Sequence, residues 1–150
     1  MARRRAREFA LKALYQADLS GGDHMGALEG LWTGLLDAET TEKPADADEM
    51  SFAKTIVGGV AERGAEIDQL IEKASKNWRL VRMPVVDRNI LRLATGEMLL
   101  MTDVPASVSI NEAVELAKTF GDKESRAFVN GILDRIASLL GRGGRHHSQK

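Results

Sequence analysis

Apolar residues recur every three or four positions along most of the chain, which is the spacing of one face of an α-helix. The first such stripe is formed by Ala6, Phe9, Ala10, Ala13, Leu14 and Ala17. No segment shows the two-residue alternation that is typical of a half-buried strand. The pattern therefore predicts an all-α protein.

Glycine, proline and capping residues divide this pattern into about seven helices. Gly21 and Gly22 end the first helix, and the Ser109 to Glu112 spacing is that of a capping box. We expect helices at residues 2–19, 23–39, 46–63, 65–76, 84–101, 109–121 and 122–140. The helix at 84–101 is apolar on most sides, which predicts a central position.

The two halves of the helical region differ in composition. Residues 1–76 are rich in alanine and charge, whereas residues 77–140 contain more large aliphatic side chains. We expect one helical domain over residues 1–140, made of two packed three-helix bundles at about 1–76 and 77–140. The Gly/Arg/His-rich residues 141–150 are of low complexity and are predicted to be disordered.

Composition excludes several classes of protein. Hydrophobic residues make up 43% of the chain, which is enough for a packed core, and cysteine is absent, so disulfides and thiolate metal sites are excluded. Two of the three histidines lie in the tail, and we expect no metal and no cofactor. No apolar run could span a bilayer and no signal peptide is recognisable, which favours a cytoplasmic protein without membrane contact. No glycine-rich phosphate loop or nucleophile motif indicates an enzyme.

Charge is distributed unevenly although the formal net charge is only −1. Residues 1–17 contain five cations against one acid, residues 18–50 nine acids against one cation, and residues 142–150 three cations and no acid. Such a molecule can hold an anion at one region and repel it elsewhere.

The first helix presents a basic face with one aromatic ring. At 100° per residue, the side opposite the apolar stripe carries Arg4, Arg5, Glu8, Lys12 and Tyr15. Arginines bind phosphates and an exposed ring can stack on an unpaired base, so this face predicts binding of single-stranded RNA. The alternative is a solvated basic end, with Tyr15 packed against a neighbouring helix.

Four segments of the chain resemble the NusB family of bacterial transcription antitermination factors. They are ARRRARE, ALYQADLS, SINEAVELAKTFG and SRAFVNGILDRIA, in the family's order and spacing. The resemblance implies two three-helix bundles and binding of boxA RNA from ribosomal RNA leaders. It also implies a heterodimer with NusE, a small-subunit ribosomal protein, and indirect assembly with other Nus factors and RNA polymerase, without catalysis.

The resemblance also implies roles for individual residues. The RNA-binding positions carried over from the family are Arg3, Arg4, Arg5, Arg7, Tyr15, Glu124, Arg126 and Phe128. We add Lys12, which shares the basic face of the first helix, and Asn130, which lies on the same side of the last helix as Arg126. Phe128 has a second interpretation as a core residue. Ala127 departs from relatives with a basic residue there, which predicts weaker RNA binding.

Asp87 and Arg88 are the predicted contacts to NusE. An acid is suited to a basic ribosomal protein, but Asp87 could equally be an ordinary acid in the first turn of a helix, paired with Arg88 or Arg92.

Two other functions stay open. NusB-like domains also help ribosomal RNA methyltransferases to bind RNA, but this chain ends soon after the helical region, so we expect no catalytic domain within it. The third interpretation is a protein-binding scaffold that self-associates, because a homodimer through the first helix would hide the RNA site.

Overall fold

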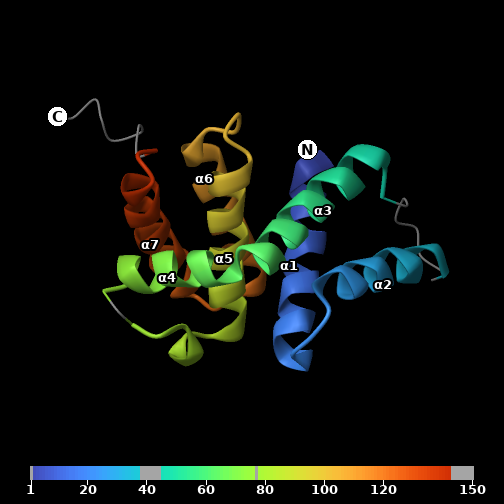
Figure 1. Cartoon of the computed structure of the whole chain (residues 1–150), viewed down its shortest axis with the longest axis horizontal. Coiled ribbons are helices and arrows are strands. Elements are labelled where there is room, and N and C mark those ends of the chain that lie inside the picture. The colour runs from blue at the N-terminus through green and yellow to red at the C-terminus, as the bar shows by residue number, and fades with distance from the viewer. Residues whose placement is uncertain (1, 38–44, 77, 143–150) are drawn as a thin grey trace.

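Seven α-helices and one short 3-10 helix form the described part of the chain, residues 2–37, 45–76 and 78–142 of this computed structural model (Figure 1). The elements are α1 (Ala2–Ser20), α2 (His24–Asp37), α3 (Ala47–Glu62), α4 (Gly64–Ala74), η1 (Leu80–Arg82), α5 (Val85–Leu100), α6 (Ala106–Phe120) and α7 (Ser125–Leu139). These residues contain no β-strand, so the predicted all-α class is confirmed. None of the described helices combines the length and hydrophobicity needed to cross a bilayer.

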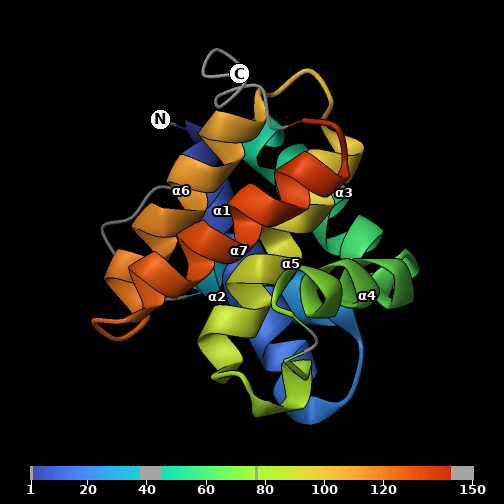
Figure 2. The same cartoon turned by 90° about the vertical axis from the view of Figure 1, so that its left-hand side faces the viewer.

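Helix α5 is the centre of the fold, as its apolar sequence predicts. It packs against α1, α3, α4, α6 and α7, and Figure 2 shows α6 and α7 side by side over it. Its buried apolar side chains include Ile90, Leu91, Leu93, Ala94 and Met98. A helix that contacts five others needs apolar residues on most of its sides, and its polar side chains Arg88, Asn89 and Arg92 bond to acids of the neighbouring helices.

Helix α1 contacts three other helices. Its predicted stripe is buried in full, and the helix packs on α2, α3 and α5. Helix α4 precedes residue 76 in the chain yet packs on α5 and α7. The division into bundles at about 1–76 and 77–140 stays a prediction.

The helix ends confirm some capping predictions and correct one. Gly21 ends α1 with a φ of 73°, and its N–H donates to the Ala17 carbonyl at 2.9 Å, as the glycine pair predicts. The capping box predicted at Ser109 and Glu112 is wrong, because α6 already begins at Ala106 and both side chains bond elsewhere. The predicted tail, with His146 and His147, lies outside the described residues apart from its first two positions.

A buried ion pair joins α1, α5 and α6. The Arg7 guanidinium donates two hydrogen bonds to the Glu97 carboxylate, at 2.8 and 2.6 Å, and the Ser109 hydroxyl donates to the same carboxylate at 2.8 Å. The Glu97 side chain is wholly buried and that of Arg7 is 6% exposed. A buried charge that loses its partner keeps its full desolvation cost.

We therefore expect Glu97→Ala to lower the free energy of unfolding by about 3–5 kcal/mol, because the buried Arg7 loses both of its close hydrogen bonds and keeps only the Glu112 carboxylate, at 3.9 Å. The matched control is Glu66→Ala, which removes the carboxylate of the exposed Arg63–Glu66 pair and is expected to cost at most about 1 kcal/mol. Urea unfolding of both variants measures the difference. Equal losses would show that the buried pair does not hold the helices together.

Candidate RNA-binding interface

The arginines at the start of α1 are held by acids from other helices. Arg4 donates two hydrogen bonds of 3.0 Å to Glu112 on α6, and Arg5 donates to Glu49 on α3 at 2.9 and 3.0 Å. Arg3 lies 4.0 Å from Asp48. Ion pairs therefore link the N-terminal end of α1 to the first turn of α3 and to the second turn of α6.

These pairs leave two of the arginines accessible. The side chains of Arg3 and Arg4 are 41% and 50% exposed, whereas that of Arg5 is 27% exposed. The hydrogen bonds from Arg4 hold the pKa of the Glu112 carboxyl below its usual value, despite the opposing effect of burial. Glu112 is therefore ionised at neutral pH and occupies the same guanidinium fork that a phosphate would use.

Glu49 has two functions at once. Its backbone N–H donates to the Asp46 carboxylate at 2.8 Å, and its own carboxylate accepts from the Asp46 N–H at 2.9 Å, which is a complete capping box. The same carboxylate binds Arg5. The start of α3 and the position of Arg5 thus depend on one side chain, which the sequence analysis did not single out.

Arg7 lies in the interior, 5% exposed, with its guanidinium occupied by Glu97. The structure therefore separates Arg7 from the other predicted RNA contacts of α1. Its position follows from the helical period, because residue 7 lies between the basic face and the apolar stripe.

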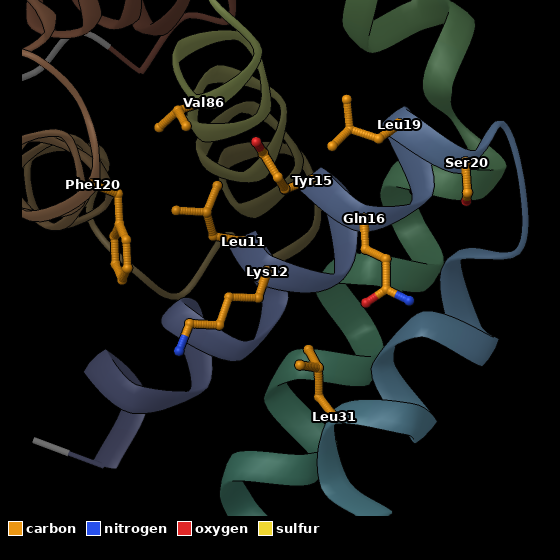
Figure 3. A pocket seen from close by; sticks show the side chains of 9 residues that line it. All are labelled: Leu11, Lys12, Tyr15, Gln16, Leu19, Ser20, Leu31, Val86 and Phe120. Atoms are coloured by element: carbon orange, nitrogen blue, oxygen red, sulfur yellow. The ribbon is translucent and has the colours of Figure 1, made fainter. Parts of the chain in front are cut away.

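Tyr15 and Lys12 border an apolar groove between α1, α2, α5 and the end of α6, with a volume of about 710 Å³. Its lining is Leu11, Lys12, Tyr15, Gln16, Leu19, Ser20, Leu31, Val86 and Phe120. Figure 3 shows Leu11 and Tyr15 projecting from α1 on the side of Val86 and Phe120. Tyr15 is 38% exposed and Leu19 61%, so the groove offers apolar surface to a partner.

Asp87 lies in the first turn of α5, as one of its two interpretations expects, but the pairing with Arg88 or Arg92 is wrong, because those arginines bind Asp18 and Asp68. It is 4% exposed and accepts a hydrogen bond of 2.7 Å from the Ser125 hydroxyl at the start of α7. Burial raises the pKa of the Asp87 carboxyl, and the Ser125 hydrogen bond only partly opposes this. Asp87 therefore fixes α7 against α5 beside the groove.

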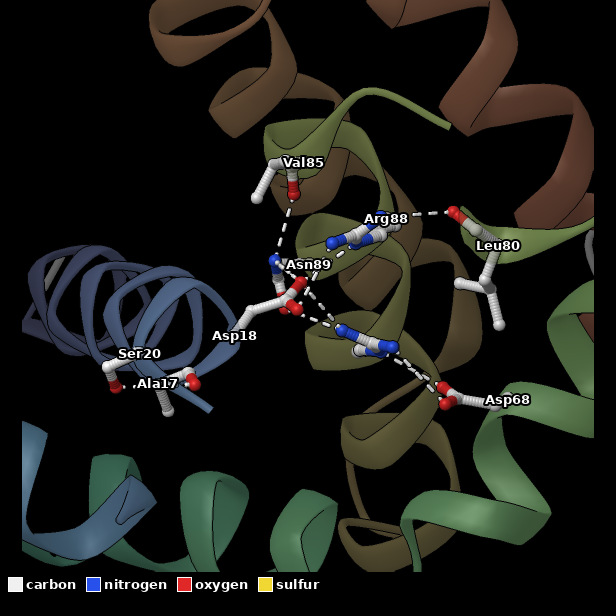
Figure 4. A network of polar contacts seen from close by, with 9 residues as sticks. Ala17, Asp18, Ser20, Asp68, Leu80, Val85, Arg88 and Asn89 are labelled. Carbon is white, nitrogen blue, oxygen red and sulfur yellow. Dashed lines mark hydrogen bonds and ion pairs between the residues drawn. The ribbon is translucent and has the colours of Figure 1, made fainter. Parts of the chain in front are cut away.

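Arg88 and Arg92 bind Asp18 of α1 instead. Arg88 donates to both carboxylate oxygens of Asp18, at 2.8 and 3.1 Å, and Arg92 donates at 3.0 Å (Figure 4). Burial would raise the pKa of Asp18, but the hydrogen bonds from Arg88 and Asn89 and the charge of Arg92 lower it. This network ties the C-terminal end of α1 to α5 and leaves Arg88 half-buried.

The predicted RNA contacts of α7 lie in and around its first turns. Glu124 and Arg126 are exposed, whereas Phe128 and Asn130 are half-buried. Phe128 packs against the core and also meets Trp78 edge-on, with ring centroids 5.2 Å apart. Trp78 is 44% exposed and was missed by the sequence analysis, although a tryptophan in a polar connector is a visible signal.

The described residues contain no group of three or more His, Cys, Asp or Glu side chains that could hold a metal ion. The polar clusters are instead arginine–carboxylate pairs that join helices. Their chemistry is that of binding and packing.

A family model described as the NusB family matches residues 4–138. The transcription antitermination protein NusB of Myxococcus xanthus is 52% identical over 139 residues, which cover 93% of this chain and 96% of that protein.

Two solved structures share the fold. That of T. maritima NusB has a TM-score of 0.80 at 40% identity, covering 91% of this chain and 90% of that one. A crystal structure of the antitermination factors NusB and NusE in complex with dsRNA has a TM-score of 0.80 at 27% identity, covering 92% and 97%. The arrangement of helices, the family model and the relatives agree, and the chain belongs to the NusB family.

Proposed function

We propose that this protein is an RNA-binding transcription antitermination factor that binds boxA-type RNA together with a NusE-class ribosomal protein. It acts by binding alone, and other Nus factors and RNA polymerase join through that complex. One observation carries the proposal: α1 has a cationic end, and further along it borders an apolar groove, so one helix offers surfaces for two chemically different partners.

The RNA surface consists of the accessible cations of α1 and the first turns of α7. Arg3 and Arg4 exchange their carboxylate partners for phosphates, because a phosphate satisfies the same fork and counterion release favours the exchange. Arg5 adds positive charge beside them while it stays bonded to Glu49. Arg7 is buried and positions α1 through its bond to Glu97. Lys12, Tyr15, Glu124, Arg126, Phe128 and Asn130 complete the proposed surface, with Lys12 and Tyr15 at its boundary with the groove.

The groove takes apolar side chains of the NusE-class protein. Tyr15 and Leu19 present large apolar surfaces to solvent at its rim, and such anchors dominate protein interfaces. Asp87 and Arg88 support this site indirectly. Asp87 fixes α7, and Arg88 fixes α1, to the start of α5. A second copy of the chain could cover the same groove, and a homodimer is therefore the competing occupant.

We expect the double substitution Arg3→Gln and Arg4→Gln to weaken binding of single-stranded boxA RNA and to reduce the salt dependence of log K. The slope should fall by roughly 0.7 for each phosphate contact that is lost. Fluorescence anisotropy at several salt concentrations measures this. Arg63→Gln, which removes an arginine that pairs with Glu66 away from the proposed RNA surface, is the control and should leave the slope unchanged. An unchanged slope in the double variant would exclude phosphate contacts by Arg3 and Arg4.

We expect Tyr15→Ala to weaken binding of the NusE-class protein by about 1–2 kcal/mol, roughly 5- to 30-fold in Kd, because the groove loses its aromatic anchor. Calorimetric titration measures the change. RNA affinity of the isolated protein should fall as well, because the same exposed ring is a predicted stacking surface for an unpaired base. Leu139→Ala, at an exposed leucine outside the groove, should leave both affinities unchanged. A loss of RNA affinity with normal partner binding would make Tyr15 a base-stacking residue instead.

A further inference from the structure

Trp78 is an exposed tryptophan beside helix α7. It lies between α4 and η1, is 44% exposed, and meets Phe128 of α7 at an interplanar angle of 84°. An edge-on contact of this kind leaves much of the ring surface unused. The exposed part of the indole is apolar surface that a ligand could cover.

Hydrogen bonds hold the backbone around this ring. The Ser75 hydroxyl donates to the Trp78 carbonyl at 3.0 Å, and the Trp78 N–H donates to the Ser75 carbonyl at 3.3 Å. On the other side, the Leu80 N–H donates to the Glu72 carboxylate at 3.0 Å. These bonds hold the backbone of Trp78 and Leu80 to the last turn of α4, so stacking on the ring would require little further ordering of that backbone.

The connector between α4 and α5 is also basic, and its cations differ in their pairing from the arginines of α1. Residues 73–82 contain Lys73, Lys76, Arg79 and Arg82 and no acid. In contrast to the arginines of α1, the exposed Lys76, Arg79 and Arg82 form no ion pair with any residue in the described ranges. Cations that no carboxylate of the same molecule neutralises remain available to an external anion.

We propose that Trp78, supported by Phe128 and flanked by Arg79 and Arg82, is a stacking platform for an unpaired base of the bound RNA. An exposed ring next to cations without counter-charges is the combination that binds single-stranded nucleic acid. A protein partner that binds this loop by apolar contacts would also use the neighbouring Val81, which is 70% exposed. Val81 has no ring on which a base could stack, so its contribution distinguishes the two kinds of partner. The platform rests on the proposed RNA-binding function and adds a contact outside α1.

The platform is connected to the groove through the start of α5. Val86 lines the groove, and the next residue, Asp87, accepts the hydrogen bond from Ser125 that fixes the first turn of α7. Phe128 lies one turn further along the same helix. The Asp87–Ser125 contact between α5 and α7 therefore positions both the RNA platform and the protein-binding groove.

The test measures binding of fluorescein-labelled single-stranded boxA RNA to the full chain and to three variants. Trp78→Ala should weaken binding roughly 5- to 150-fold without changing the salt slope, because stacking releases no counterions. Trp78→Phe keeps a ring and should retain most of the affinity, and Val81→Ala should bind like the unaltered protein. Circular dichroism and thermal unfolding of each variant verify the fold.

Intrinsic fluorescence gives a second measurement that a structural role of Trp78 would not produce. The other tryptophan, Trp32, is 7% exposed, so quenching by stacked RNA should come from Trp78 and disappear in Trp78→Phe. RNA binding without quenching, or with equal affinity in Trp78→Ala, would overturn the platform and leave the proposed function intact. Absence of RNA binding in the unaltered protein would overturn both. A loss confined to binding of the NusE-class protein would make the loop a protein contact.

Discussion

The Arg7–Glu97 pair sets the position of the helix on which both proposed surfaces depend. Its hydrogen bonds of 2.8 and 2.6 Å fix α1 to α5, and the Ser109 hydroxyl brings α6 to the same carboxylate. Directional bonds between buried charges fix the rotation of a helix about its axis more narrowly than apolar packing does, because only one register satisfies both partners. With α1 held in this way, Arg3 and Arg4 lie at the surface and Tyr15 borders the groove.

The same chemistry controls how accessible the basic face is. Glu112 and Glu49 each occupy an arginine fork, so RNA must compete with a carboxylate that belongs to the protein. Such competition lowers affinity for any polyanion and favours ligands that make further contacts. The groove and the Trp78 platform are where those contacts would form, one for protein and one for an unpaired base.

Much of the fold could be predicted because each helix has a local signal. The helical period predicts the buried stripe of α1 and the central position of the largely apolar α5. The backbone conformation that glycine favours predicts the end of α1 at Gly21. The Ser109 prediction failed because the carboxylate of Glu97, on a different helix, takes its hydroxyl. A capping box is a local preference worth about 1 kcal/mol, and a buried charge that needs a donor outweighs it.

The sequence by itself determined the all-α class, the helix order, the basic character of the N-terminus and the resemblance to the NusB family, because these depend on residues close together in the chain. Only the tertiary structure decided that Arg7 is internal, that Arg88 and Arg92 bind Asp18, and that Trp78 stands beside Phe128. The paired residues in these contacts are 50 to 90 positions apart, and no local pattern specifies which acid meets which arginine. That choice is made when the helices pack, since a buried charge must find a partner among whatever side chains the packing brings near.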